Sequence, residues 1–359
     1  MSASIVRTRL DYPRILSDAW DAHLAPRAPN APTVISTFAG AGGSSLGYSM
    51  AGYRELLAVE WDDHAAQCFR RNFPHVRLHH GDIADLDPSD LGLEPGALDV
   101  LDGSPPCQAF SMVGERQIDD PRNQLFREYV RLLTHWQPKT FVMENVAGMV
   151  KGQMRSLFAE ILGTLKAAGP GYRVTARLMD ASYFHVPQRR LRMIFVGVRR
   201  DLDLPAVHPA PQARPVTVRE ALAALDDPGP FQRPSAKAAR VAPLIAPGRN
   251  GGDTLTGLGG KKAFFSLQRL AWDRPAFTLV KQFSPSRNGV LHPAEDRNLG
   301  VREIARLQSF PDAFDWGDSA VDQVWARIGN SVPPLMMRAI AQTQREYILD
   351  AAEFGRAQR

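Results

Sequence analysis

The strongest constraint on the fold is a regular alternation of short β-rich runs and longer helical segments across residues 33–180. The runs are rich in β-branched and apolar residues, and the segments between them carry apolar residues at helical spacing. Such an alternation predicts a doubly wound, mostly parallel α/β sheet of the Rossmann-like type. The predicted strands are residues 33–39, 54–60, 76–80, 98–103, 140–144, 172–179 and 192–198, and the predicted helices are residues 62–72, 123–136 and 153–168.

The amino-acid composition of the chain changes after Arg200. Pro, Ala and Gly dominate residues 204–260, which is typical of loops around a compact irregular unit; a disordered linker is the alternative. A small core favours the compact unit, and it would contain Phe264, Phe265, Leu267, Trp272, Phe277 and Val280. We predict an extension at 1–32, a first domain at 33–204, a smaller irregular domain at 205–317, and a segment at 318–359 whose amphipathic helix, 334–354, packs back on the first domain.

Basic charge is concentrated in the second domain. The chain has a net charge of +5, whereas residues 231–300 contain eleven Lys and Arg against four acids, a local excess of +7. A basic surface of this kind favours binding to nucleic acid, with a merely solvated basic face as the alternative. The three histidines His75, His79 and His80 match no standard zinc spacing, so we expect no metal.

The cysteine count and the hydropathy bear on the compartment. Two cysteines in 359 residues exclude a disulfide framework, which favours a reducing environment. We find no apolar leader at the N-terminus and no run long enough to span a bilayer. We therefore expect a cytoplasmic protein without membrane association.

A glycine-rich loop follows the first predicted strand. Gly40, Gly42 and Gly43 allow a tight turn and a close approach of the backbone to a ligand at a helix N-terminus, whereas the third glycine of a dinucleotide fingerprint is replaced by Ser45. Glu60, twenty residues later, suits a ribose diol. Trp61 beside it could flank a sugar or base, and Asp82 after the third strand could meet an exocyclic amine. This combination predicts an adenosyl cofactor without a diphosphate; a solvated strand end and a helix cap are the plain structural alternatives for Glu60 and Asp82.

The reactive group predicted from sequence is Cys107, which follows Pro105 and Pro106 directly after a predicted strand. A thiol in such a stiff loop is poorly placed for packing and well placed for attack. Glu144 ends another predicted strand, and the carboxyl ends of parallel strands share one edge of the sheet, so we expect an acid close to the thiol. Arg190 and Arg192 lie two residues apart, where one or both could hold that carboxylate and a polar substrate.

Six ordered motifs of the chain resemble those of the DNA cytosine carbon-5 methyltransferases, and the resemblance runs from about Val34 to Ile340. The motifs are Phe38-Ala39-Gly40-Ala41-Gly42-Gly43, Pro105-Pro106-Cys107-Gln108, Glu144-Asn145-Val146, Gln188 with Arg190 and Arg192, Arg302-Glu303 with Arg306-Leu307-Gln308 and Phe310-Pro311, and Gly329-Asn330-Ser331-Val332-Pro333.

The resemblance implies a chemistry and its residues. S-adenosyl-L-methionine would be the methyl donor, S-adenosyl-L-homocysteine its product, and a cytosine flipped out of double-stranded DNA the acceptor. Cys107 would attack carbon 6 of the ring, Glu144 would bond or protonate ring nitrogen 3, and Arg192, with Arg190 as second candidate, would hold Glu144 and the cytosine carbonyl. The cofactor site would comprise Phe38, Ala39, Gly40, Gly42, Gly43, Glu60, Trp61, Asp82, Ile83, Pro105, Leu125, Asn330, Ser331 and Val332.

In this interpretation residues 33–204 are the catalytic domain and residues 205–317 the target-recognition domain. DNA contacts are expected from Gln108, Ser111, Lys261, Lys262, Lys281, Gln282 and Arg287. The resemblance further implies a monomeric bacterial or phage modification enzyme, associated with the nucleoid, with a separate restriction endonuclease as a possible companion. A transfer-RNA cytosine-5 methyltransferase and a catalytically silent nucleic-acid-binding module remain as alternatives.

Overall fold

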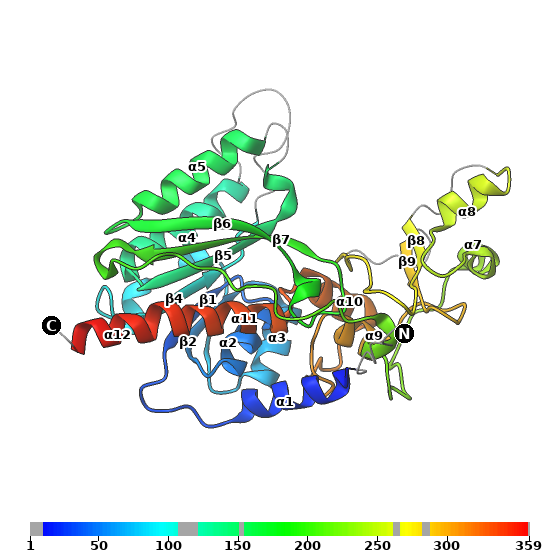
Figure 1. The fold of residues 1–359 in the computed structure, drawn as a ribbon, viewed down its shortest axis with the longest axis horizontal. Helices are drawn as coiled ribbons and strands as arrows, with labels where there is room; N and C mark the ends of the chain where they lie inside the picture. Colours follow the sequence, from blue (N-terminus) through cyan, green and yellow to red (C-terminus); the bar gives the residue numbers. More distant parts are fainter. Residues whose placement is uncertain (1–9, 107–120, 151–153, 261–265, 282–287, 358–359) are drawn as a thin grey trace, which may run out of the picture.

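The structure, a computed structural model, describes residues 10–106, 121–150, 154–260, 266–281 and 288–357 (Figure 1). Its centre is a seven-stranded sheet with the strand order β3-β2-β1-β4-β5-β7-β6. The strands are β1 (Thr33–Thr37), β2 (Arg54–Glu60), β3 (Arg77–His80), β4 (Val100–Gly103), β5 (Thr140–Val146), β6 (Tyr172–Asp180) and β7 (Leu191–Arg199).

The first five strands are parallel, and β7 runs antiparallel to both of its neighbours, β5 and β6. The predicted mostly parallel sheet is thus confirmed, and every predicted strand forms with ends shifted by two residues or fewer. The predicted helices also form, as α3 (Asp63–Asn72), α4 (Pro121–Trp136) and α5 (Met154–Ala167).

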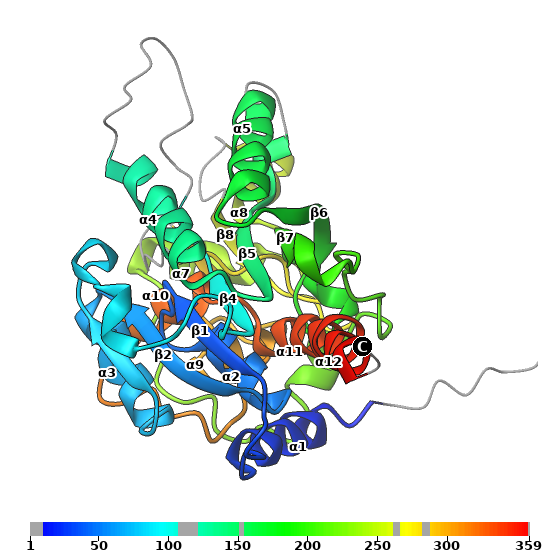
Figure 2. The ribbon, with the colours of Figure 1, turned by 90° about the vertical axis from the view of Figure 1, so that its left-hand side faces the viewer.

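Helices cover both faces of the sheet, as Figure 2 shows. Because successive strand residues point to opposite faces, Val34 packs with one apolar cluster while Ile35 packs with another. The first cluster includes side chains of α1 (Tyr12–Leu24), α2 (Gly43–Met50) and α11 (Pro334–Gln344), and the second includes side chains of α4 and α5. None of the helices in the described ranges is long and apolar enough to cross a membrane.

The C-terminal helix α11 packs against the helix that follows β1. Helix α11 packs on α2, where Gly47 permits the contact because a Cβ there would lie 2.6 Å from the Cβ of Met337 and 2.7 Å from the carbonyl oxygen of Pro334. The helix predicted at 334–354 is not continuous, since a π-helical turn at Arg345–Leu349 separates α11 from α12 (Asp350–Ala357). The hydroxyl of Tyr53 donates to the carbonyl of Ala341, which further ties the two regions together.

The region between β7 and α9 (Val301–Leu307) is irregular. It contains the short helices α6 (Val218–Ala221), α7 (Ala236–Val241) and α8 (Gly251–Gly257) and the parallel pair β8 (Ser266–Arg269) and β9 (Asn288–Leu291). Its own small core contains Ala238, Val241, Ala242, Ile245, Leu267 and Leu291.

The predicted core of this region was right only for Leu267. Trp272 and Phe277 pack instead against the larger cluster of the sheet, and Val280 is 55% exposed. Phe264 and Phe265 lie outside the described residues. The core differs because residues 276–280 run along the segment before β7 rather than inside the second domain, as Ala276 shows by pairing with Gln188.

Gly47→Ala should lower the free energy of unfolding by about 1–3 kcal/mol, because the added methyl group would force α2 and α11 apart. Gly163→Ala is the matched control: Gly163 lies exposed within α5, and a Cβ there would meet nothing within 4 Å. That variant should gain about 0.5–1 kcal/mol from helix propensity. Urea unfolding of both variants measures the difference; equal effects would contradict the packing argument.

Candidate active site

The site lies at the carboxyl edge of the sheet, where an acid and a cation meet. Because β7 is antiparallel to β5, its first residues lie beside the last residues of β5, with Arg192 opposite Val146. Arg192 Nε lies 2.6 Å from Glu144 Oε1, and the two side chains are only 14% and 12% exposed. A partly desolvated pair of this kind is strongly oriented, and Nη1 of the same guanidinium donates to the carbonyl oxygen of Leu191 at 2.8 Å.

The proposed nucleophile, Cys107, lies outside the described residues, but the chain leading to it is fixed beside Glu144. Asn145 follows Glu144 in β5 and is 4% exposed; its side-chain amide donates to the carbonyl oxygen of Pro105 at 3.0 Å. The strand that carries the acid therefore also holds the start of the cysteine loop.

Arg190 makes contacts that differ from those expected of a substrate clamp. It is 1% exposed, and its guanidinium donates to the carbonyl oxygens of Leu279, Gly329 and Ser331. Burial, followed by the nearby positive charge of Arg192, lowers the pKa of Arg190 to about 9. Of the two arginines, only Arg192 forms an ion pair with Glu144 among the described residues.

Around Arg190 lies a buried polar network that joins distant segments. The side chain of Gln188 accepts from the backbone N–H of Leu279 and donates to Gln308, and Gln308 donates to the carbonyl of Ser331. Gln188 and Gln308 are fully buried. The entry to β7, the end of α9 and the turn before α11 are therefore locked together.

The glycine loop is held by Glu60 rather than by the backbone alone. Its two carboxylate oxygens accept from the backbone N–H groups of Gly40, at 2.7 Å, and Asp62, at 2.9 Å. Burial raises the pKa of Glu60, and these two hydrogen bonds oppose the rise. Next to it, the indole of Trp61 is 77% exposed.

The remaining residues predicted for the cofactor site surround this loop. Phe38 has φ of +57°, a strained value for a non-glycine residue at the end of β1. Its side chain packs in the same apolar cluster as Ile83 and Leu125. From the far end of the chain, Ser331 and Val332 approach Gly43 so closely that a Cβ there would lie 2.5 Å from the Val332 carbonyl oxygen. Asn330 beside them is exposed, as is Asp82, whose side chain caps a short 3₁₀ turn by accepting from Ala84.

Asp102 is a buried acid near the site that sequence reasoning missed. It lies in β4 immediately before Gly103, is 3% exposed, and accepts from the hydroxyl of Tyr48. Burial raises its pKa to about 8, an effect that a hydrogen bond from Ser44 opposes. Only its place at the end of a central strand could have indicated it.

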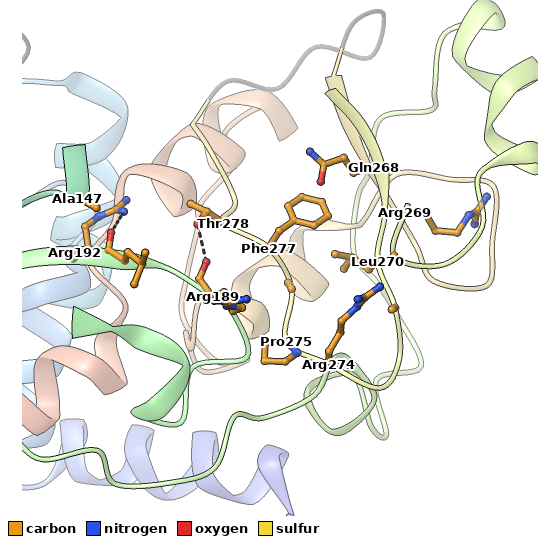
Figure 3. A pocket seen from close by; sticks show the side chains of 14 residues that line it. Ala147, Arg189, Arg192, Gln268, Arg269, Leu270, Arg274, Pro275, Phe277 and Thr278 are labelled. Atoms are coloured by element: carbon orange, nitrogen blue, oxygen red, sulfur yellow. Dashed lines mark hydrogen bonds between the residues drawn. The ribbon is translucent and has the colours of Figure 1, made fainter. Parts of the chain in front are cut away.

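A cavity of about 610 Å³ lies between the start of β7 and the irregular region (Figure 3). The catalytic side contributes Arg192 and Ala147, and the other wall comes from residues 268–278. The full lining comprises Ala147, Arg189, Leu191, Arg192, Gly248, Gln268, Arg269, Leu270, Ala271, Arg274, Pro275, Ala276, Phe277 and Thr278.

Most DNA contacts predicted from sequence cannot be placed. Gln108, Ser111, Lys261, Lys262, Gln282 and Arg287 lie outside the described residues, whereas Lys281 is described and exposed. Gln268 and Arg274 line the cavity instead, and neither was predicted as a DNA contact, because their orientation depends on the strand pairing of β8 and on the path of residues 270–278.

Solved structures of other proteins share this fold. The fold is that of a Rossmann-like methyltransferase: a putative DNA modification methyltransferase from an Escherichia coli prophage superposes with a TM-score of 0.73 at 24% identity, covering 89% of this chain and all of its own. DNMT2 of Spodoptera frugiperda superposes with a TM-score of 0.64 at 18% identity, covering 90% and 100% of the two chains.

The sequence comparisons define the family. The model of the C-5 cytosine-specific DNA methylase matches residues 32–228 and 259–345. The type II methyltransferase M1.HphI of Haemophilus parahaemolyticus is 33% identical, covering 86% of each chain, and M.NgoPII of Neisseria gonorrhoeae is 32% identical, covering 88% of this chain and 96% of its own. The chain therefore belongs to the C-5 cytosine-specific DNA methylase family, which confirms the predicted enzyme class.

Asp102→Asn should reduce the pH dependence of stability. A carboxyl whose pKa rises from 3.8 to about 8 on folding favours the folded state most below pH 4, and this contribution is lost as the pH rises toward 8. The asparagine cannot ionise, so urea unfolding between pH 5 and 9 should show a smaller loss of stability than in the unsubstituted protein. An unchanged slope of the free energy of unfolding against pH would contradict the raised pKa of Asp102. Burial also raises the pKa of Glu55, to about 7, so Glu55 accounts for part of the slope that remains. The variant Glu55→Gln tests that part.

Proposed function

We propose that the protein transfers a methyl group to carbon 5 of a cytosine flipped out of double-stranded DNA, through a transient covalent bond between Cys107 and carbon 6. The observation that carries this proposal is the ion pair between Glu144 and Arg192, on the same strand edge to which Asn145 anchors the cysteine loop. Family membership supports duplex DNA as the substrate class.

The residues around the glycine loop fit an S-adenosyl group. Gly40 has φ of +59°, and the space where its Cβ would lie is open. Glu60 fixes the loop yet keeps a lone pair on each oxygen for a ribose diol, and the exposed indole of Trp61 offers a surface for the sugar or base. When bound, S-adenosyl-L-methionine supplies the methyl group and leaves as S-adenosyl-L-homocysteine.

Protein groups perform the remaining steps on the cytosine. The thiolate of Cys107 forms a bond to carbon 6 while Glu144, oriented by Arg192, hydrogen-bonds or protonates ring nitrogen 3. Electron density thereby moves to carbon 5, which becomes the nucleophile toward the methyl group. Loss of the proton from carbon 5 to a base then expels the cysteine sulfur and restores the aromatic ring, now methylated.

In this proposal the remaining contacts serve position rather than chemistry. Arg190 holds the recognition region and the turn at Gly329 to Ser331 against β7, so that Arg192 and the cofactor loop keep their places. We further propose that the protein acts as a monomer on DNA in the bacterial cytoplasm, alongside a separately acting restriction endonuclease, as the type II names of its relatives favour.

Cys107→Ala should abolish methyl transfer while cofactor binding is retained, because the covalent bond to carbon 6 cannot form. Incorporation of labelled methyl groups from S-adenosyl-L-methionine into mixed-sequence duplex DNA measures turnover, and a duplex with 5-fluorocytosine should trap the unsubstituted protein, since fluorine cannot leave as a proton.

The chain supplies its own control. Cys68 is 3% exposed, donates to the carbonyl of Asp315, and has a pKa that burial raises to about 12, so it is not a nucleophile at neutral pH. Cys68→Ala should therefore retain turnover and trapping. Turnover by Cys107→Ala would remove Cys107 as nucleophile, and transfer only to RNA would overturn the substrate.

A further inference from the structure

Strand β8 presents two different faces. Leu267 and Arg269 are buried, at 2% and 5% exposure, whereas Gln268 between them lines the cavity that also contains Arg192. Successive residues of a strand point to opposite sides. Because Leu267 and Arg269 point into the protein, Gln268 must point the other way, into the cavity. Figure 3 shows Gln268 on the same side as Phe277, with Arg269 pointing away from it.

Arg269 anchors this strand with unusual completeness. Its guanidinium forms an ion pair with Asp296 and donates to the carbonyl oxygens of Ala242, Ile245, His292 and Glu295, at 2.8, 2.7, 2.9 and 2.7 Å. The backbone of Gln268 is further paired with Asn250 on one side and Val290 on the other. The side chain of Gln268 is therefore mounted on a rigid base, as a residue that reads a ligand by geometry requires.

The amide of Gln268 has no hydrogen-bond partner among the described residues. Other polar groups of the cavity are engaged: Arg192 pairs with Glu144, and the hydroxyl of Thr278 donates to the carbonyl of Arg189. Arg189 and Arg274 have exposed side chains in the same cavity. The wall thus combines cations suited to phosphates with one neutral group that carries unused donors and an unused acceptor.

We propose that Gln268 reads a base edge of the duplex next to the target cytosine and specifies adenine at one position of the recognition sequence. A carboxamide matches adenine in the major groove, since its oxygen accepts from N6 and its nitrogen donates to N7. This inference rests on the proposed function, because it requires duplex DNA in the cavity. Arg274 holds the phosphate backbone and carries no sequence information.

The test is a methylation profile. The unsubstituted protein and its variants methylate a duplex library with randomised flanks, and bisulfite sequencing gives the relative rate for each base at each position. The unsubstituted protein should require adenine at one position near the cytosine. Gln268→Ala should lose roughly 5- to 150-fold of the discrimination at that position and none elsewhere.

Two further variants distinguish base recognition from phosphate binding. Gln268→Glu keeps the shape of the side chain but only accepts hydrogen bonds, so the preference at the same position should move from adenine toward cytosine, whose N4 donates. Arg274→Ala should lower methylation of all sequences alike and weaken its dependence on salt, with the profile unchanged.

The outcomes distinguish this inference from the proposed function. If the unsubstituted protein methylates no duplex DNA, the proposed function fails. If it methylates a defined sequence and both Gln268 variants, folded as judged by thermal unfolding, keep its profile, the role of Gln268 is wrong. Loss of discrimination at a position that requires a base other than adenine would overturn the adenine assignment.

Discussion

The architecture depends on one buried cation. Arg190 is almost completely withdrawn from water, which costs several kcal/mol, and the cost is offset only because its guanidinium reaches three carbonyl oxygens. Those carbonyls belong to Leu279, in the segment that runs along the entry to β7, and to Gly329 and Ser331 before α11. The guanidinium therefore joins the start of β7, the segment at residues 276–280 and the returning C-terminal segment.

The reversed direction of β7 brings this structural anchor to the edge of the sheet where Glu144 lies. A parallel strand next to β5 would begin at the opposite edge of the sheet, whereas antiparallel β7 begins at the edge where β5 ends. Arg190 and Arg192 therefore lie at the same edge of the sheet. Arg190 is buried among backbone carbonyls, and Arg192 lies beside Glu144. The same segment pairs with Ala276, so backbone hydrogen bonds fix one wall of the cavity relative to the pair of Glu144 and Arg192.

Local patterns predicted much of this, and long-range contacts account for what they did not. The strand and helix alternation, and the meeting of Glu144 with an arginine, follow from period and topology. The different contacts of Arg190 and Arg192 could not be predicted in this way, because both residues are arginines and, from the sequence alone, either could pair with a carboxylate. Glu60 was expected to serve a ligand, yet its two oxygens also hold the glycine loop, and Asp82 caps a turn. The misplaced core residue Val280 shows the same limit, since its neighbour Leu279 is bound by Gln188, 91 residues earlier, and its own carbonyl accepts from Trp325, 45 residues later.

The charge of the recognition region illustrates why sequence counts overstate a binding surface. Of the eleven cations in residues 231–300, Arg269 serves as an internal anchor, and Arg297 is held between Glu295 and Glu303. Cations that can meet phosphates must be exposed, as Arg189 and Arg274 are in the cavity and Lys281 is outside its lining. In the proposed complex, exposed cations would hold the phosphates without regard to sequence, whereas an amide such as that of Gln268 would contact a base edge. Arg269 is unavailable to phosphates, and it serves instead to fix the strand from which Gln268 enters the cavity.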